Sequence, residues 1–132
     1  MLGELIGDEA GKVTGFRVLD AAGPKVEVSF QAKGKVFGID YQGRGTYASA
    51  MQAGGFLYGE GQGMYMTVDG DIAVWKGQGT GRLLAGGGVS YRGAIHYMTA
   101  TGKLARLLGT VGVFEHSTDA SDNVVSKVWE WK

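Results

Sequence analysis

Apolar and polar residues alternate without a break from Lys25 to Lys35. The apolar members of this segment are Val26, Val28, Phe30 and Ala32. Successive side chains of an extended chain point to opposite faces, so a period of two is typical of a strand with one buried face. This segment therefore predicts a half-buried β-strand.

Segments of the same kind recur at nearly even spacing along the chain. We expect strands near residues 4–20, 25–36, 38–49, 56–68, 71–82, 88–100, 107–118 and 124–131. Helix-forming residues gather only between Thr101 and Leu108, with Thr101 as a candidate N-cap, and this stretch is too short for more than one or two turns. Because nothing resembles a crossover helix, parallel βαβ units are excluded.

The chain contains 25 glycines and one proline, which is unusual for a folded domain. Disorder is excluded because 44% of the residues are hydrophobic and alternate with polar ones. Glycines stand at alternate positions of neighbouring strands, where barrel closure requires tight bends. We predict that residues 1–132 form one all-β domain, a closed antiparallel up-and-down barrel of about eight strands, with a two-sheet sandwich as the alternative.

Charge and cysteine content exclude several classes of partner. Thirteen basic residues balance thirteen acidic ones and are scattered, so neither nucleic acid nor an anionic membrane is an expected partner. The chain has no cysteine, which removes disulfides and thiolate chemistry and suits a reducing compartment. The N-terminal residues lack the features of a signal peptide. A soluble, cytoplasmic protein is expected.

The dipeptide Asp69-Gly70 predicts a two-residue hairpin, with glycine supplying the positive φ. Such a turn pairs Tyr58 with Gly81 and Met64 with Trp75. One face of the two strands then carries Tyr58, Glu60, Gln62, Met64 and Met66 beside Trp75, Gly77, Gly79 and Gly81. We assign this face to the barrel interior because most of its large side chains are apolar.

The interior assignment predicts a ligand cavity, because glycines opposite long side chains leave space. The expected lining is Tyr58, Glu60, Gln62, Met64, Met66, Trp75, Phe30 and Phe114. Glu60 and Gln62 would supply the polar contacts. In the alternative interpretation the glycines only relieve crowding at barrel corners, and Glu60 points outward.

No metal or cofactor site is predicted. His96 and His116 are the only histidines, and neither lies in a helical metal-binding spacing. The segment from Gly43 to Ala48 fits G-x-G-x-x-A, but no helix follows it, so a dinucleotide site is rejected. A serine hydrolase is not supported because the G-x-S-x-G motif is missing.

Two further groups of residues leave alternatives open. Arg92 and His96 share one strand face, which points either to solvent or inward, where Arg92 would pair with Glu60. Trp129 and Trp131 share a face of the last strand. They either cover the core or, if exposed, form an apolar patch suited to an oligomer interface.

The glycine ladders at 59–63 and 77–81, the Tyr91-Arg92-Gly93-Ala94-Ile95 segment and the Trp129-Glu130-Trp131 ending resemble a group of uncharacterised bacterial and archaeal calycin-like barrels. That group is similar in architecture to allene oxide cyclase. The resemblance implies an enclosed cavity and permits isomerase chemistry. It transfers no catalytic residue, because the similarity to the cyclase is one of fold.

Three functions follow as hypotheses. The first is binding of a small, mostly apolar molecule inside the barrel. The second is a cofactor-free isomerase or cyclase with Glu60 as base or electrostatic stabiliser and Arg92 or Tyr58 as its partner. The third is a filled barrel that acts in homo-oligomeric assembly through its outer surface.

Overall fold

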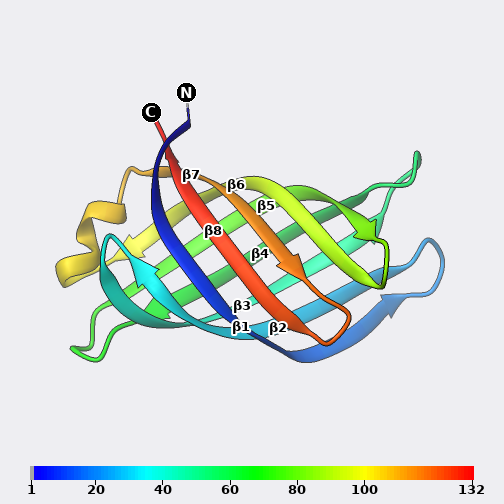
Figure 1. The fold of residues 1–132 in the computed structure, drawn as a ribbon, viewed down its shortest axis with the longest axis horizontal. Helices are drawn as coiled ribbons and strands as arrows, with labels where there is room; N and C mark the ends of the chain where they lie inside the picture. The colour runs from blue at the N-terminus through cyan, green and yellow to red at the C-terminus, as the bar shows by residue number, and fades with distance from the viewer. Residues whose placement is uncertain (1) are drawn as a thin grey trace.

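The alternating segments form eight antiparallel strands that close into a barrel in the order β1-β2-β3-β4-β5-β6-β7-β8, as the computed structural model of residues 2–132 shows (Figure 1). The elements are β1 (Leu2–Asp20), β2 (Lys25–Val36), β3 (Ile39–Met51), β4 (Leu57–Met66), β5 (Ile72–Leu84), β6 (Gly88–Ala100), the 3-10 helix η1 (Gly102–Leu107), β7 (Val111–Thr118) and β8 (Asn123–Trp131). The predicted fold class is confirmed, and the sandwich is wrong because β8 pairs with β1.

The predicted strand boundaries agree closely with the observed ones except at the start of β7. We expected this strand near residue 107, but it begins at Val111 because η1 occupies the preceding residues. The expected short helical stretch is therefore present. Thr101 occupies the N-cap position, although its hydroxyl makes no capping hydrogen bond and instead accepts the backbone N–H of Ile72.

One end of the barrel is covered by η1 (Figure 1, yellow). Leu104 and Leu107 are fully buried against the side chains of the barrel core. Burial of two leucines contributes about 1.5–3 kcal/mol each, which holds a helix too short to be stable alone. Arg106 adds a cation–π contact, with its guanidinium 3.7 Å from the centre of the Phe37 ring.

The opposite end is lined by apolar side chains that remain exposed. Phe16 pairs with the inward-facing Val28, and Leu83 pairs with Val89. The exposed fractions of Phe16 and Leu83 are nevertheless 66% and 63%. The β1–β2, β3–β4 and β5–β6 connections project at this end (Figure 1). The two ends of the barrel therefore differ: η1 covers one and exposed apolar residues line the other.

The β4–β5 connection is longer than the sequence predicted. The Thr67 N–H donates to the Asp71 carbonyl and the Gly70 N–H donates to the Thr67 carbonyl, so three residues lie at the tip instead of two. Gly70 has the expected positive φ of 88°. The extra residue shifts the register by one, which reverses the face of every side chain on one strand relative to the other.

The shifted register places the glycine rows of β4 and β5 opposite each other on the inner face. Gly59 pairs with Gly79, and Gly61 pairs with Gly77. Aromatic rings of other strands occupy the space that missing side chains would fill. A Cβ atom at Gly45 would lie 2.6 Å from the Phe30 ring. The glycines are thus required where rings lie flat against the barrel wall.

Candidate functional site

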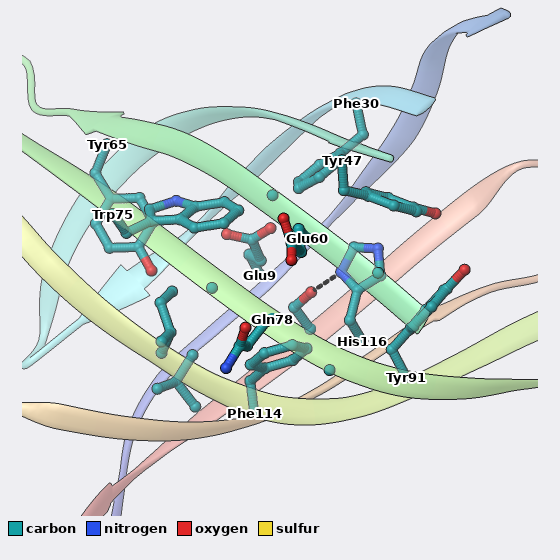
Figure 2. Close-up of a pocket in the computed structure, with 17 residues that line it drawn as sticks. Glu9, Phe30, Tyr47, Glu60, Tyr65, Trp75, Gln78, Tyr91, Phe114 and His116 are labelled. Carbon is teal, nitrogen blue, oxygen red and sulfur yellow. Dashed lines mark hydrogen bonds between the residues drawn. The ribbon is translucent and has the colours of Figure 1, made fainter. Parts of the chain in front are cut away.

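A cavity of about 80 Å³ lies inside the barrel, between the core beneath η1 and the apolar end. Six aromatic side chains, one from each of the strands β2 to β7, surround it: Phe30, Tyr47, Tyr65, Trp75, Tyr91 and Phe114. Figure 2 shows these rings around the space, with Glu9 and His116 among them. The lining is mostly apolar, with few polar groups, which is the usual character of a small-molecule site.

Where β4 and β5 form the cavity wall, glycines line the inner face. Residues 59–61 and 77–79 close the cavity on this side, and their glycines contribute no side chain. A polar groove on the outside of the barrel includes the same backbone, together with Gln62, Lys76 and His96. The cavity and this outer groove are therefore separated by a single layer of main chain.

His116 is the buried polar centre of the cavity. Its exposed fraction is 8%, and its Nδ1 atom lies 2.5 Å from the Ser126 hydroxyl on the paired strand β8. Its Nε2 atom has no hydrogen-bond partner among the described residues. Burial lowers the pKa of the imidazole from 6.5 to about 4, so the ring is neutral at physiological pH.

Aromatic rings hold the imidazole in place. The Phe30 ring centre lies 5.0 Å from the His116 ring centre, and the Tyr47 ring meets the imidazole edge-on at 5.6 Å. Tyr91 packs edge-on against Tyr47, and its hydroxyl is hydrogen-bonded to the buried Ser49 hydroxyl. These contacts leave His116 little rotational freedom, and Nε2 is its only unsatisfied polar atom.

The inward-facing carboxyl of the cavity belongs to Glu9 on β1. The Tyr41 hydroxyl donates a 2.6 Å hydrogen bond to Glu9 Oε1. Tyr41 stacks on Tyr65, whose hydroxyl lies 3.2 Å from that of Tyr97. Burial raises the pKa of the Glu9 carboxyl, and the hydrogen bond from Tyr41 opposes that rise. Burial likewise raises the pKa of Tyr97 to about 12, so this hydroxyl stays neutral.

The predicted orientation of the even-numbered β4 residues is wrong. Tyr58, Glu60, Gln62, Met64 and Met66 belong to the outer face, and Met66 is 45% exposed. The one-residue register shift is the physical reason. Glu60 contributes to the cavity only as part of the wall, and its Oε1 atom lies 2.8 Å from the Tyr58 hydroxyl on the outside. The alternative interpretation of an outward Glu60 is the correct one.

Arg92 also lies outside the barrel, which removes its expected pairing with Glu60. Its side chain is 72% exposed and forms an ion pair with Glu115, Nε to Oε1 3.7 Å. His96 is exposed on the same outer face. The proposed catalytic group of Glu60, Arg92 and Tyr58 therefore does not come together inside the barrel.

Phe30, Trp75 and Phe114 do line the cavity, and their role in ligand binding stays a prediction. Sequence reasoning missed Glu9 and His116. His116 stands two residues after Phe114 in the same strand, so strand alternation places both on one face. The same alternation could have identified Glu9 from Gly11 and Val13, although irregular pairing early in β1 weakens that signal.

Within residues 2–132, no three histidine, aspartate or glutamate side chains cluster closely enough to hold a metal ion. No helix in the same range has the length and apolar character needed to cross a membrane.

Solved structures share this fold at low sequence identity. A conserved protein of unknown function from Rhodopseudomonas palustris has a TM-score of 0.80 and 15% identity, over 98% of this chain and 97% of that one. A protein with unknown function from Clostridium acetobutylicum has a TM-score of 0.80 and 12% identity, over 98% of each chain. A beta-barrel like protein from Acinetobacter baumannii has a TM-score of 0.76 and 14% identity, over 100% of this chain and 96% of that one.

No family model and no curated protein matches the sequence. The structural neighbours establish the β-barrel fold and its extent over the whole chain. Their identities are too low to transfer a ligand or an activity.

Proposed function

We propose that this barrel binds a small, mostly apolar molecule that carries one hydrogen-bonding group. The observation that supports the proposal is the unpartnered Nε2 atom of His116 in the wall of a mostly apolar cavity. A buried polar atom without a partner costs about 1–3 kcal/mol, and a ligand that supplies the partner recovers that free energy on binding.

The neutral imidazole limits the kind of group that it recognises. If the Ser126 hydroxyl donates to Nδ1, Nε2 carries the proton and donates to a carbonyl or ether oxygen. If Nδ1 donates to Ser126, Nε2 accepts from a hydroxyl. In both cases the partner is uncharged, because an ionised group would be desolvated without a counter-charge at His116.

The cavity volume limits the buried part of the ligand. About 80 Å³ corresponds to roughly two to three water-sized groups, and an engineered cavity of about 150 Å³ binds benzene. Benzene-sized molecules therefore require movement of a lining ring such as Phe114. The exposed apolar end, with Phe16 and Leu83, offers the entry route.

Phenol and benzene are the probes that test this proposal. We expect phenol to bind more tightly than benzene by about fivefold, because one net hydrogen bond contributes about 1 kcal/mol. Binding is measured by NMR through the ¹⁵N shift of His116 Nε2, which reports the hydrogen bond directly. The variant Phe114→Ala should strengthen both interactions because it enlarges the cavity.

The matched control removes the polar centre without leaving a buried hydroxyl unpaired. In His116→Leu with Ser126→Ala, the preference for phenol over benzene should disappear while benzene still binds. Val128→Leu should weaken both probes by filling space, because Val128 lines the cavity. Binding of neither probe, in the wild type and in Phe114→Ala, would contradict the proposal.

A second candidate, proton transfer inside the cavity, is favoured by the positions of Glu9 and His116. Burial raises the pKa of Glu9 and lowers that of His116, so it favours the protonated carboxyl, which can donate a proton, and the neutral imidazole, which can accept one. These residues replace Glu60, Arg92 and Tyr58 in the isomerase hypothesis. Solvent deuterium exchange into butanone, catalysed by the wild type and lost in Glu9→Gln, tests it, and exchange no faster than in buffer would exclude it.

Two finer expectations belong to the same proposal. The resemblance to calycin-like barrels supports an enclosed apolar ligand. The lack of cysteine in all 132 residues suits a reducing compartment, and we propose a cytoplasmic location.

A further inference from the structure

The outer face of β1, β8, β7 and β6 carries an apolar row that the described chain leaves partly exposed. Leu5, Trp129, Val113 and Ala94 pair in register across these four strands. Leu5 is 48% exposed, and Trp131, on the same outer face of β8, is 60% exposed. The β1, β8 and β7 strands lie side by side in Figure 1. Trp129, Val113 and Ala94 are half-buried. A partly exposed apolar row with tryptophan at its centre is typical of protein interfaces.

A charged row runs beside the apolar row and shows which partner the face fits. Asp8, Lys127, Glu115 and Arg92 pair in register across the same four strands. Their charges alternate as negative, positive, negative, positive. If the four strands of a second copy are placed in the opposite order, each negative charge of one copy therefore lies opposite a positive charge of the other.

A twofold axis parallel to the strands, between β8 and β7, performs this reversal. It brings β1 of one copy opposite β6 of the other and β8 opposite β7. Asp8 then faces Arg92 of the second copy, and Lys127 faces Glu115. In the apolar row the large Trp129 faces the smaller Val113. An axis perpendicular to the strands would instead place Asp8 against Asp8, so the charges select the first arrangement.

We infer that this face, defined by the apolar row and the charged row, is the interface of a homodimer built face to face about that axis. Charge complementarity sets the orientation, and the buried apolar row supplies the affinity. This inference is independent of the cavity and its ligand.

Sedimentation equilibrium over a wide range of protein concentration tests the dimer. The average mass should rise from 13.9 kDa toward twice that value as concentration increases. Trp129→Ala should weaken the dimer by at least about thirtyfold, which corresponds to about 2 kcal/mol for a central aromatic residue. Phe16→Ala, at the exposed end of the barrel, is the matched control and should leave association unchanged.

A charge exchange tests the orientation. Asp8→Lys places like charges opposite each other at Arg92 of the second copy and should raise the dimer dissociation constant about tenfold. Adding Arg92→Glu should restore most of the affinity. Asp8 and Arg92 are separated by two strands within one copy, so this rescue is intermolecular. Asp40→Lys makes the same charge change on β3, outside the face, and should have no effect.

Circular dichroism and thermal melting of each variant confirm that the barrel is intact. A wild type that stays at 13.9 kDa at every concentration would overturn the inference. If Trp129→Ala leaves the dimer dissociation constant unchanged, the interface lies elsewhere and the inference is overturned. The same holds if adding Arg92→Glu to Asp8→Lys fails to restore the affinity.

Discussion

His116 on β7 and Ser126 on β8 face each other in register, and the Nδ1 and Oγ atoms lie 2.5 Å apart inside the barrel. The hydroxyl satisfies one nitrogen of a buried neutral ring and leaves the other, Nε2, without a partner. This asymmetry leaves one unpaired, directional polar atom in a mostly apolar cavity. It also makes the stability of the barrel sensitive to pH.

Acid should lower the free energy of unfolding through protonation of His116. Burial lowers the native pKa of His116 to about 4, so between about pH 6.5 and 4 the unfolded state binds a proton that the native state does not. The His116 contribution to stability is therefore complete above that range, and about 3 kcal/mol is lost as pH falls through it. Urea unfolding at a series of pH values measures the free energy.

The His116→Leu, Ser126→Ala double variant is the control for this prediction. Other groups that titrate in the same range act equally on both proteins, so the variant should lose less stability than the wild type between pH 7 and about pH 4. Equal losses in the two proteins would mean that His116 titrates normally in the native state.

Glu9 should make the barrel less stable as pH rises, which is the opposite pH dependence to that of His116. Burial raises the native pKa of this carboxyl, so the native state holds the proton more tightly than the unfolded state. Stability is then lost as pH rises through the native pKa. Glu9→Gln keeps an acceptor for Tyr41 and should be more stable than the wild type at alkaline pH.

Glu4→Gln changes an exposed carboxyl of the same strand and should shift the melting temperature little at any pH. Thermal melts of the two variants across the pH range provide the comparison. If Glu9→Gln destabilises the barrel at alkaline pH, the ionised carboxylate is well solvated or paired in the native state.

The third prediction concerns the glycines beneath the aromatic rings. A Cβ atom at Gly45 would lie 2.6 Å from the Phe30 ring and 3.1 Å from Trp75. Gly45→Ala should therefore cost about 1–3 kcal/mol by overpacking. Gly15→Ala meets only Ser29 at 3.7 Å and should be neutral or stabilising by up to about 1 kcal/mol. Chemical denaturation measures both, and similar effects would mean that the rings move aside freely.

Strand alternation was sufficient to predict the barrel, because the period of two is a local property of the sequence. It placed Phe30 on the inner side of β2 and the segment 88–100 in a single strand, as the structure confirms. Turn length was harder to predict. Asp69-Gly70 fits both a two-residue and a three-residue loop, and the difference of one residue reversed the faces of β4.

The sequence by itself determined the eight strands, the short helical stretch after β6 and the apolar character of the core. Only the tertiary structure decided that Glu9 and His116 share a cavity while the side chains of Glu60 and Arg92 lie on the outer face of the barrel. The reason is physical: alternation fixes which residues share a face, but inside and outside are decided by register and by the rings that pack against glycine. Those contacts join residues far apart in the chain.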